Sequence, residues 1–133
     1  MSRSNYSDDL DQWDLIRWRG AVKSAIRGKR GQTFLREMID SLDAMPHKRL
    51  IAHELMEDGD VCAIGSVGVS RGVDMTRVNV EDGDQIAEMF GVANALVREV
   101  EYMNDEGVYR PETPEERWVR MRAWVEAQIE VTG

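Results

Sequence analysis

The amino-acid sequence predicts an all-α fold, a compact bundle of about six or seven short helices in a single domain, residues 1–133. Apolar residues recur at helical spacing in several stretches, and glycine or proline separates those stretches from one another. Apolar residues also make up 42% of the chain, which excludes a compositionally disordered protein. A chain of this length fits one domain and can bury a sizeable core.

The first helix is predicted over residues 8–27. Asp8 or Asp9 suits its N-cap, because a short carboxylate accepts hydrogen bonds from the free backbone N–H groups there. Gly28 suits the left-handed conformation that commonly follows the last turn of a helix. The apolar stripe expected on one face is Leu15, Trp18, Val22, Ala25 and Ile26.

The second helix is predicted over residues 32–44, because Pro46 disfavours helical geometry at the residue before it. Its amphipathic stripe is Phe34, Leu35, Met38, Ile39 and Leu42. A third, shorter helix is predicted over residues 47–57. Its inward residues are expected to be Leu50, Ile51 and Leu55.

Residues 60–72 carry an ambiguous pattern. Small apolar residues alternate in a way that suits a strand, and the same small residues suit a tightly packed helix. We favour the helix, because a lone strand needs a partner. The only candidate partner, residues 73–80, is polar for a strand.

Two helices over residues 83–90 and 92–103 are predicted to meet at Gly91, and the stretch 85–100 resembles a helix-turn-helix. Its expected apolar positions are Ile86, Phe90, Val92, Val97 and Val100. Its second helix would offer Asn94, Leu96, Arg98, Glu99 and Glu101 to a DNA groove. Carboxylates near phosphates oppose binding, so the pattern favours a structural pair of helices over a DNA-reading one.

The last helix follows a polar loop at residues 104–112. Thr113 is its predicted N-cap, Pro114 occupies the first helical position, and Glu116 completes a capping box. The stripe expected to be buried is Trp118, Met121, Val125 and Ile129.

The net charge of −8 is unevenly distributed along the chain. Seven basic residues and no acidic residue lie between Arg17 and Arg36, which leaves the rest of the chain at −15. Such a block can hold phosphates or an acidic protein surface, or it can pair with the protein's own carboxylates. The candidate partner-binding residues are Arg17, Lys23, Arg27, Lys29 and Arg30. Trp13 and Trp18 lie close enough in sequence to stack on bases if they are exposed.

No catalytic, cofactor-binding or metal site is predicted. Cys62 is the only cysteine, and its apolar neighbours predict that it packs in the interior. Two weak metal candidates, His53 with Glu54 and Glu57, and residues 104–106, match no metal-binding motif. The clustered acidic residues suit solubility and helix capping, and imitation of a phosphate backbone is the alternative.

The first 13 residues lack the apolar run of a signal peptide, and no apolar stretch approaches the roughly 20 residues that span a bilayer. A single cysteine also gives no sign of a disulfide framework. We therefore expect a cytoplasmic protein without a membrane partner. The oligomeric state stays open.

Three segments resemble a family of small uncharacterised proteins encoded by phages and prophages of proteobacteria. The segments are WRGAVKSAIRGKRGQTFLREM (18–38), GDVCAIGSVGVSRGVDM (59–75) and YMNDE with ETPEERWVRMRAWV (102–125). The resemblance implies a phage accessory protein made inside a bacterial host cell. Such proteins often bind a host protein, including defence systems such as CRISPR–Cas. It implies no site residues, since the family has no assigned activity.

We therefore expect a non-enzymatic accessory protein that binds a host or phage macromolecule, with an inhibitor of a bacterial defence system as the sharpest form. The partner is expected to be a protein. The alternative is a nucleic-acid-binding accessory or regulatory protein that uses residues 17–36 and the helix-turn-helix-like pair. A small enzyme ranks third, because no motif supports one.

Overall fold

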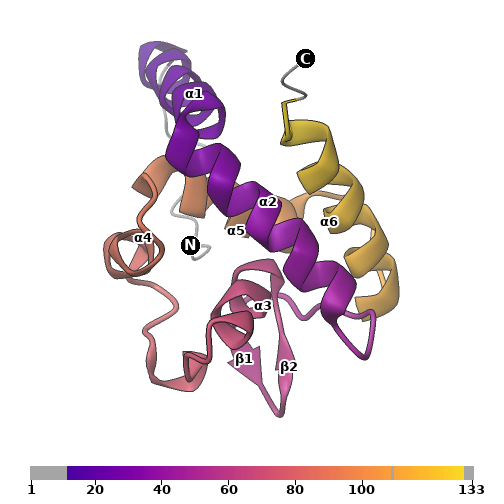
Figure 1. Ribbon diagram of the computed structural model, residues 1–133. Helices are drawn as coiled ribbons and strands as arrows, with labels where there is room; N and C mark the ends of the chain where they lie inside the picture. The colour runs from indigo at the N-terminus through magenta and orange to yellow at the C-terminus, as the bar shows by residue number, and fades with distance from the viewer. Residues whose placement is uncertain (1–11, 109, 131–133) are drawn as a thin grey trace.

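Amphipathic helices supply almost all of the regular structure in the computed structural model, which describes residues 12–108 and 110–130 (Figure 1). The predicted all-α class is confirmed. The helices are α1 (Gln12–Arg27), α2 (Lys29–Ala44), α3 (Ala63–Ser70), α4 (Gly83–Phe90), α5 (Asn94–Glu106) and α6 (Pro114–Gln128). The remaining elements are β1 (Met56–Glu57), β2 (Asp60–Val61) and the short 3₁₀ helix η1 (Met75–Arg77).

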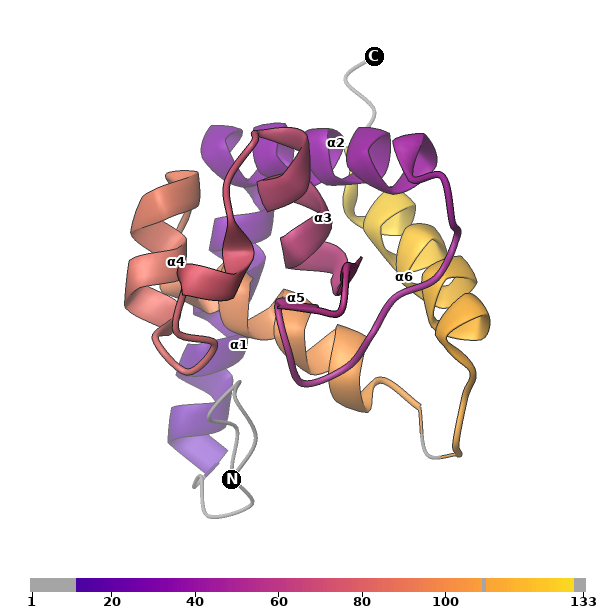
Figure 2. The ribbon, with the colours of Figure 1, turned by 90° about the horizontal axis from the view of Figure 1, so that it is seen from below.

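Helix α2 organises the core, because its apolar stripe meets three other helices. It packs against α1, α3 and α6, and in Figure 2 it lies across one side of the molecule above α3. Phe34, Leu35, Met38 and Leu42 are buried, and Ile39 is half-buried at the edge of this cluster. The helix ends at Ala44, and Met45 before Pro46 is extended, as predicted.

The corner between α1 and α2 differs from the prediction. Gly28 is extended rather than left-handed and serves as the N-cap of α2, so Lys29 and Arg30 lie in the first helical turn. The close approach occurs at Gly31, where a Cβ would overlap the carbonyl oxygen of Ala25. The glycine requirement of this corner is therefore steric, and it falls three residues later than predicted.

Only the second half of the predicted α1 stripe reaches the core. Val22 is buried, Trp18, Ala25 and Ile26 are half-buried, and Leu15 is exposed. The guanidinium of Arg98 lies 5.6 Å from the centre of the Trp18 ring. The predicted start at residues 8–11, with its Asp8 or Asp9 cap, lies outside the described residues.

The predicted helix over residues 47–57 is wrong, because tertiary hydrogen bonds hold this segment in an irregular path. The N–H of Leu50 donates to the carbonyl oxygen of Pro114 at 3.0 Å, and the N–H of Ile51 donates to that of Val61 at 2.9 Å. These partners satisfy backbone groups that a helix would otherwise pair internally. The inward side chains Leu50 and Leu55 are buried as predicted, and Ile51 is half-buried.

Residues 60–72 are mainly helical, as favoured, with a short strand before the helix. β1 and β2 pair antiparallel across Asp58 and Gly59, which both have positive φ. The strand partner is therefore residues 56–57 rather than 73–80. Helix α3 follows directly, and the thiol of Cys62 accepts a hydrogen bond from the N–H of Gly65 at 3.4 Å. Cys62 is buried, as predicted.

The C-terminal helices agree with the sequence prediction. Gly91 ends α4 in the left-handed conformation, and α5 runs three residues beyond its predicted end at 103. The capping box of α6 forms between Thr113 and Glu116. Of the predicted stripe, Met121 and Val125 are buried, whereas Trp118 and Ile129 are half-buried. The Trp118 indole N–H donates to the carbonyl oxygen of Leu42 at 3.1 Å, which joins α6 to α2.

Candidate binding site

All basic residues of the 17–36 segment are exposed. Arg17 pairs with Asp14 one turn away at 3.1 Å, and Arg27 lies 3.9 Å from Glu130. Within the described part of the chain, Lys23, Lys29 and Arg30 form no ion pair. Exposed pairs of this kind contribute little stability. The predicted partner-binding residues are thus exposed at the surface, and three of them form no ion pair with a described carboxylate.

One face of α1 combines exposed apolar and basic side chains. Trp13, Ile16, Gly20, Lys23 and Arg27 recur at helical spacing on the side opposite Val22, over about 21 Å of helix. The Trp13 side chain is 72% exposed and that of Ile16 is 53% exposed. We call these five residues the outer face of α1. Its first half offers apolar contact area and its second half offers positive charge.

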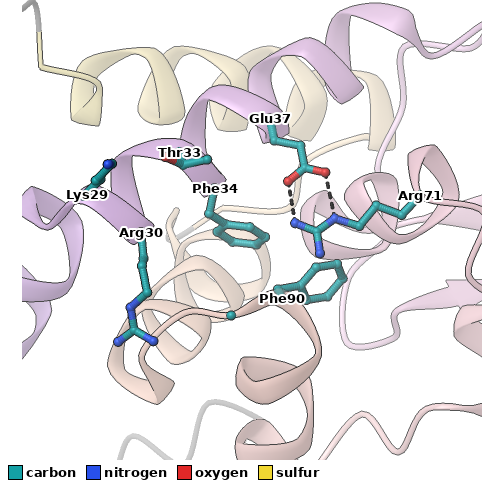
Figure 3. A pocket seen from close by; sticks show the side chains of 8 residues that line it. Lys29, Arg30, Thr33, Phe34, Glu37, Arg71 and Phe90 are labelled. Atoms are coloured by element: carbon teal, nitrogen blue, oxygen red, sulfur yellow. Dashed lines mark hydrogen bonds and ion pairs between the residues drawn. The ribbon is translucent and has the colours of Figure 1, made fainter.

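A pocket of about 230 Å³ lies beside the first turns of α2 (Figure 3). Its lining residues come from three helices and their ends: Lys29, Arg30, Thr33, Phe34, Glu37, Arg71, Phe90 and Gly91. The rings of Phe34 and Phe90 belong to the core, with centroids 5.4 Å apart and ring planes inclined by 44°. We call this feature the α2 pocket. It has an aromatic floor and charged groups around it.

Arg71 and Glu37 form one wall of the α2 pocket. Arg71 donates two hydrogen bonds to the Glu37 carboxylate, at 2.7 and 2.6 Å, and its guanidinium lies 5.0 Å from the centre of the Phe90 ring. The hydrogen-bonded Arg71 lowers the pKa of Glu37, so this carboxyl group stays ionised at neutral pH. Because the pair neutralises itself, the net positive charge of the pocket comes from Lys29 and Arg30.

The pocket residues that do not belong to α2 are positioned by the local backbone at the ends of α3 and α4. Arg71 is the C-cap of α3, where its N–H bonds the last carbonyl groups of that helix, and Gly72 then turns the chain with positive φ. Gly91 leaves a gap in the wall because it has no side chain. The sequence indicated Lys29 and Arg30 as candidate binding residues but gave no sign of Arg71, Glu37 or Phe90 beside them, because no spacing connects residues brought together from three helices.

The helix-turn-helix-like pair does not present the surface that DNA reading would require, which agrees with the favoured interpretation of a structural pair. Helix α5 packs against α1, α3, α4 and α6. Leu96 and Glu101, which the sequence placed among the groups offered to a groove, are both buried. Arg98 is half-buried against Trp18, and Asn94 donates to the Asp84 carboxylate at 2.6 Å. The pair is a structural part of the bundle.

The weak metal candidate at residues 104–106 has a structural role. Asn104 is buried, accepts a hydrogen bond from the N–H of Ala63 at 3.1 Å and donates to the carbonyl oxygen of Ile51 at 2.9 Å. Asp105 accepts from the N–H of His53 at 3.0 Å. Over the described ranges, no group of three or more His, Cys, Asp or Glu side chains is arranged to hold a metal ion.

No protein-family model, curated protein or solved structure matches this chain in the comparisons. Among the helices described, none has both the length and the apolar character needed to cross a membrane. The geometry and charge of the outer face of α1 and of the α2 pocket are therefore the grounds for a functional proposal.

Proposed function

We propose that this chain is a non-enzymatic binding protein that contacts an acidic surface of a partner protein through the outer face of α1 and the adjoining start of α2. The observation that carries the proposal is the continuous exposure of Trp13, Ile16, Lys23 and Arg27 on one helix face. Lys29 and Arg30 continue the positive charge past the corner at Gly28.

A protein partner suits this mixture of side chains better than a nucleic acid. Interfaces between proteins are enriched in tryptophan and arginine and bury aliphatic side chains at their centres. Ile16 has no role in contacting a phosphate backbone, and the net charge of −15 outside the 17–36 segment repels one. An acidic protein offers fewer and more localised charges, so the basic surface can meet it without bringing the acidic body close.

The resemblance to phage and prophage proteins suggests which kind of protein the partner is. For a phage accessory protein in the cytoplasm of a bacterial host, the partner is a host or phage protein. Inhibition of a bacterial defence system is the sharpest form of this proposal. An inhibitor that works by occupying its target needs an exposed binding surface, which the outer face of α1 would supply.

Two observations favour binding of single-stranded nucleic acid as the second candidate function. Trp13 is 72% exposed and available for base stacking, and Lys23, Lys29 and Arg30 have no carboxylate partner in the described segments. Stacking on aromatic rings and contacts from cations to phosphates are the usual components of such binding. This mode would use α1 and α2 only, since α5 is enclosed.

The test compares what different variants of the protein retain from an infected or lysogenic host. We expect the double reversal Lys23→Glu/Arg27→Glu to lower recovery of the specific partner roughly tenfold or more, because it inverts the charge of the outer face. The matched control is Arg77→Glu/Arg110→Glu, which makes the same change in net charge at two exposed positions away from α1 and α2. Equal recovery by both double variants would refute the proposal.

The second candidate function is tested on the same proteins. Salt-sensitive binding of single-stranded DNA or RNA, lost in Lys29→Glu/Arg30→Glu, would replace the protein partner with a nucleic acid. We expect weak or no binding at physiological salt.

A further inference from the structure

We infer that the α2 pocket receives one apolar side chain flanked by carboxylates, from an acidic segment of the partner protein. This inference rests on the proposed function and adds to it the place and the chemistry of an anchoring contact.

The floor of the pocket selects an apolar group. Phe34 and Phe90 line the pocket although both side chains are buried in the core, and Gly91 adds backbone without a side chain. Figure 3 shows Phe34 between Arg30 on one side and the Arg71–Glu37 pair on the other, with the Phe90 ring beside Arg71. A side chain placed on the rings loses water contact and gains the contacts of an aromatic pocket, which is the usual environment of a dominant interface residue.

The rim of the pocket selects negative charge. Lys29 and Arg30 form no ion pair in the described part of the chain, and Thr33 adds a hydroxyl group about one turn further along α2. The pocket lies at the N-terminal end of α2, where the helix dipole adds to the positive potential. An apolar side chain with a carboxylate on either side therefore matches the floor and the rim together.

The opposite wall disfavours a phosphate group. Arg71 bonds Glu37 through two nitrogens, so its guanidinium is already engaged and is not free to clamp a phosphate. The charges left for a ligand are those of Lys29 and Arg30, and a singly charged carboxylate on either side of an apolar side chain matches them. The volume of about 230 Å³ is below the roughly 300–1,000 Å³ of pockets for cofactors and drug-sized ligands, which suits a single side chain.

The experiment is an NMR titration of the ¹⁵N-labelled protein with the acetylated, amidated tripeptide Glu-Phe-Asp. We expect saturable shifts at the backbone amides of Thr33, Phe34, Arg71 and Gly91. Two control peptides separate the requirements: Glu-Ala-Asp lacks the apolar side chain, and Gln-Phe-Asn lacks the charges. Each should bind roughly tenfold more weakly than the parent peptide. The same titration is carried out with inorganic phosphate and with adenosine monophosphate.

Variants of the protein distinguish this inference from the proposed function. Arg30→Glu and Thr33→Trp should abolish the peptide shifts, by reversing the rim charge and by filling the pocket. Arg36→Glu makes the same charge change on an exposed position of α2 outside the pocket and should leave peptide binding within twofold. Lys23→Glu/Arg27→Glu should also leave peptide binding intact while it reduces partner recovery. Their own ¹⁵N spectra show whether the variants are folded.

Three results would overturn the inference. The first is the absence of saturable shifts at the pocket amides with Glu-Phe-Asp. The second is equal binding of either control peptide. The third is tighter binding of phosphate or adenosine monophosphate at the same amides, which would assign the pocket to a phosphate-bearing ligand. Loss of partner recovery in the outer-face variant, with no peptide binding at all, would retain the proposed function and remove only this pocket.

Discussion

The arginines of α6 and the basic residues of α1 and the start of α2 all carry positive charge, but the first are paired inside the fold and the second are exposed. Arg120 bonds both oxygens of Glu112, at 3.0 and 2.7 Å, and donates to the carbonyl oxygens of Met103 and Asn104. Arg117 donates to the carbonyl oxygen of Leu50 at 2.9 Å. Lys23, Lys29 and Arg30, by contrast, are exposed, and no ion pair engages them within the described residues.

The difference shows that positive charge alone does not identify a binding surface. The α6 arginines join the loop before α6, the end of α5 and the segment 47–55, so their charge is used inside the fold. Within the described residues, Lys23, Lys29 and Arg30 form no ion pair that would hold the fold together, and the proposed function assigns them to a partner. Substitutions in the two regions should accordingly change different properties: stability in the first and binding in the second.

The largest expected effect is that of Arg120→Ala. It leaves the Glu112 carboxylate, whose side chain is only 6% exposed, without its main partner, and it leaves two carbonyl groups unpaired. We expect the free energy of unfolding to fall by about 3 kcal/mol. Arg30→Ala is the matched control and should stay within about 0.5 kcal/mol of the parent. Urea denaturation measures both, and equal losses would remove the contrast between the two regions.

The second largest effect is expected at the corner between α1 and α2, where Gly31 lies close to the backbone of Ala25. In Gly31→Ala the new methyl group would overlap the carbonyl oxygen of Ala25, so the backbone must move. A loss of about 2 kcal/mol is expected in thermal or chemical unfolding. Gly20→Ala makes the same substitution within α1, where nothing lies near the added Cβ, and should stabilise the protein by about 0.5–1 kcal/mol. A stable Gly31→Ala variant would mean that the two helices do not approach so closely.

A smaller effect is expected at the start of α6, where the capping box fixes the helix that carries the paired arginines. Thr113→Ala removes the hydroxyl that accepts from the N–H of Glu116 at 3.1 Å. The expected cost is about 1 kcal/mol of unfolding free energy. Thr113→Ser, which keeps the acceptor, should recover most of it. A melting temperature unchanged in Thr113→Ala would show that this cap contributes nothing.

The smallest expected effect concerns how the stability that the Arg120–Glu112 pair contributes depends on pH. Hydrogen bonding from Arg120 lowers the pKa of Glu112 below its ordinary value of 4.5. A lowered folded-state pKa contributes stability that is fully present above pH 4.5 and is lost as the pH falls through the lower folded value. The stability gap between the parent and Glu112→Gln should therefore narrow below pH 4.5. A gap that stays constant from pH 7 to pH 3 would contradict a pairing of Arg120 with ionised Glu112.

Local signals in the sequence predicted those parts of the fold that local interactions determine. The capping box at Thr113 and the stop before Pro46 involve residues within a few positions of one another, and both were correct. The path of residues 47–55 depends instead on Pro114, Val61 and Asn104, which are distant in sequence. No helical periodicity can indicate such hydrogen bonds, so the prediction of a helix there failed.

Only part of the candidate site could be predicted from the sequence. Charge distribution along the sequence indicated Lys23, Lys29 and Arg30, because a run of cations without acids is visible in a one-dimensional reading. The partners of those cations in a pocket were not predictable, since Arg71 and Phe90 come from other helices. Glycine at the corner misled the prediction, because its role is a close approach at Gly31 rather than a turn at Gly28.

Site-specific photocrosslinking inside living cells that make the protein tests the central claim most directly. A photoreactive phenylalanine analogue is placed either at Ile16, on the outer face of α1, or at Val119, an exposed apolar position on α6 that is 63% exposed. We predict one dominant protein crosslink from position 16 and little or none from position 119, with the position-16 crosslink lost in Lys23→Glu/Arg27→Glu. A crosslink from position 119 as strong as that from position 16, or one that persists in the double variant, would contradict the assignment of partner binding to α1.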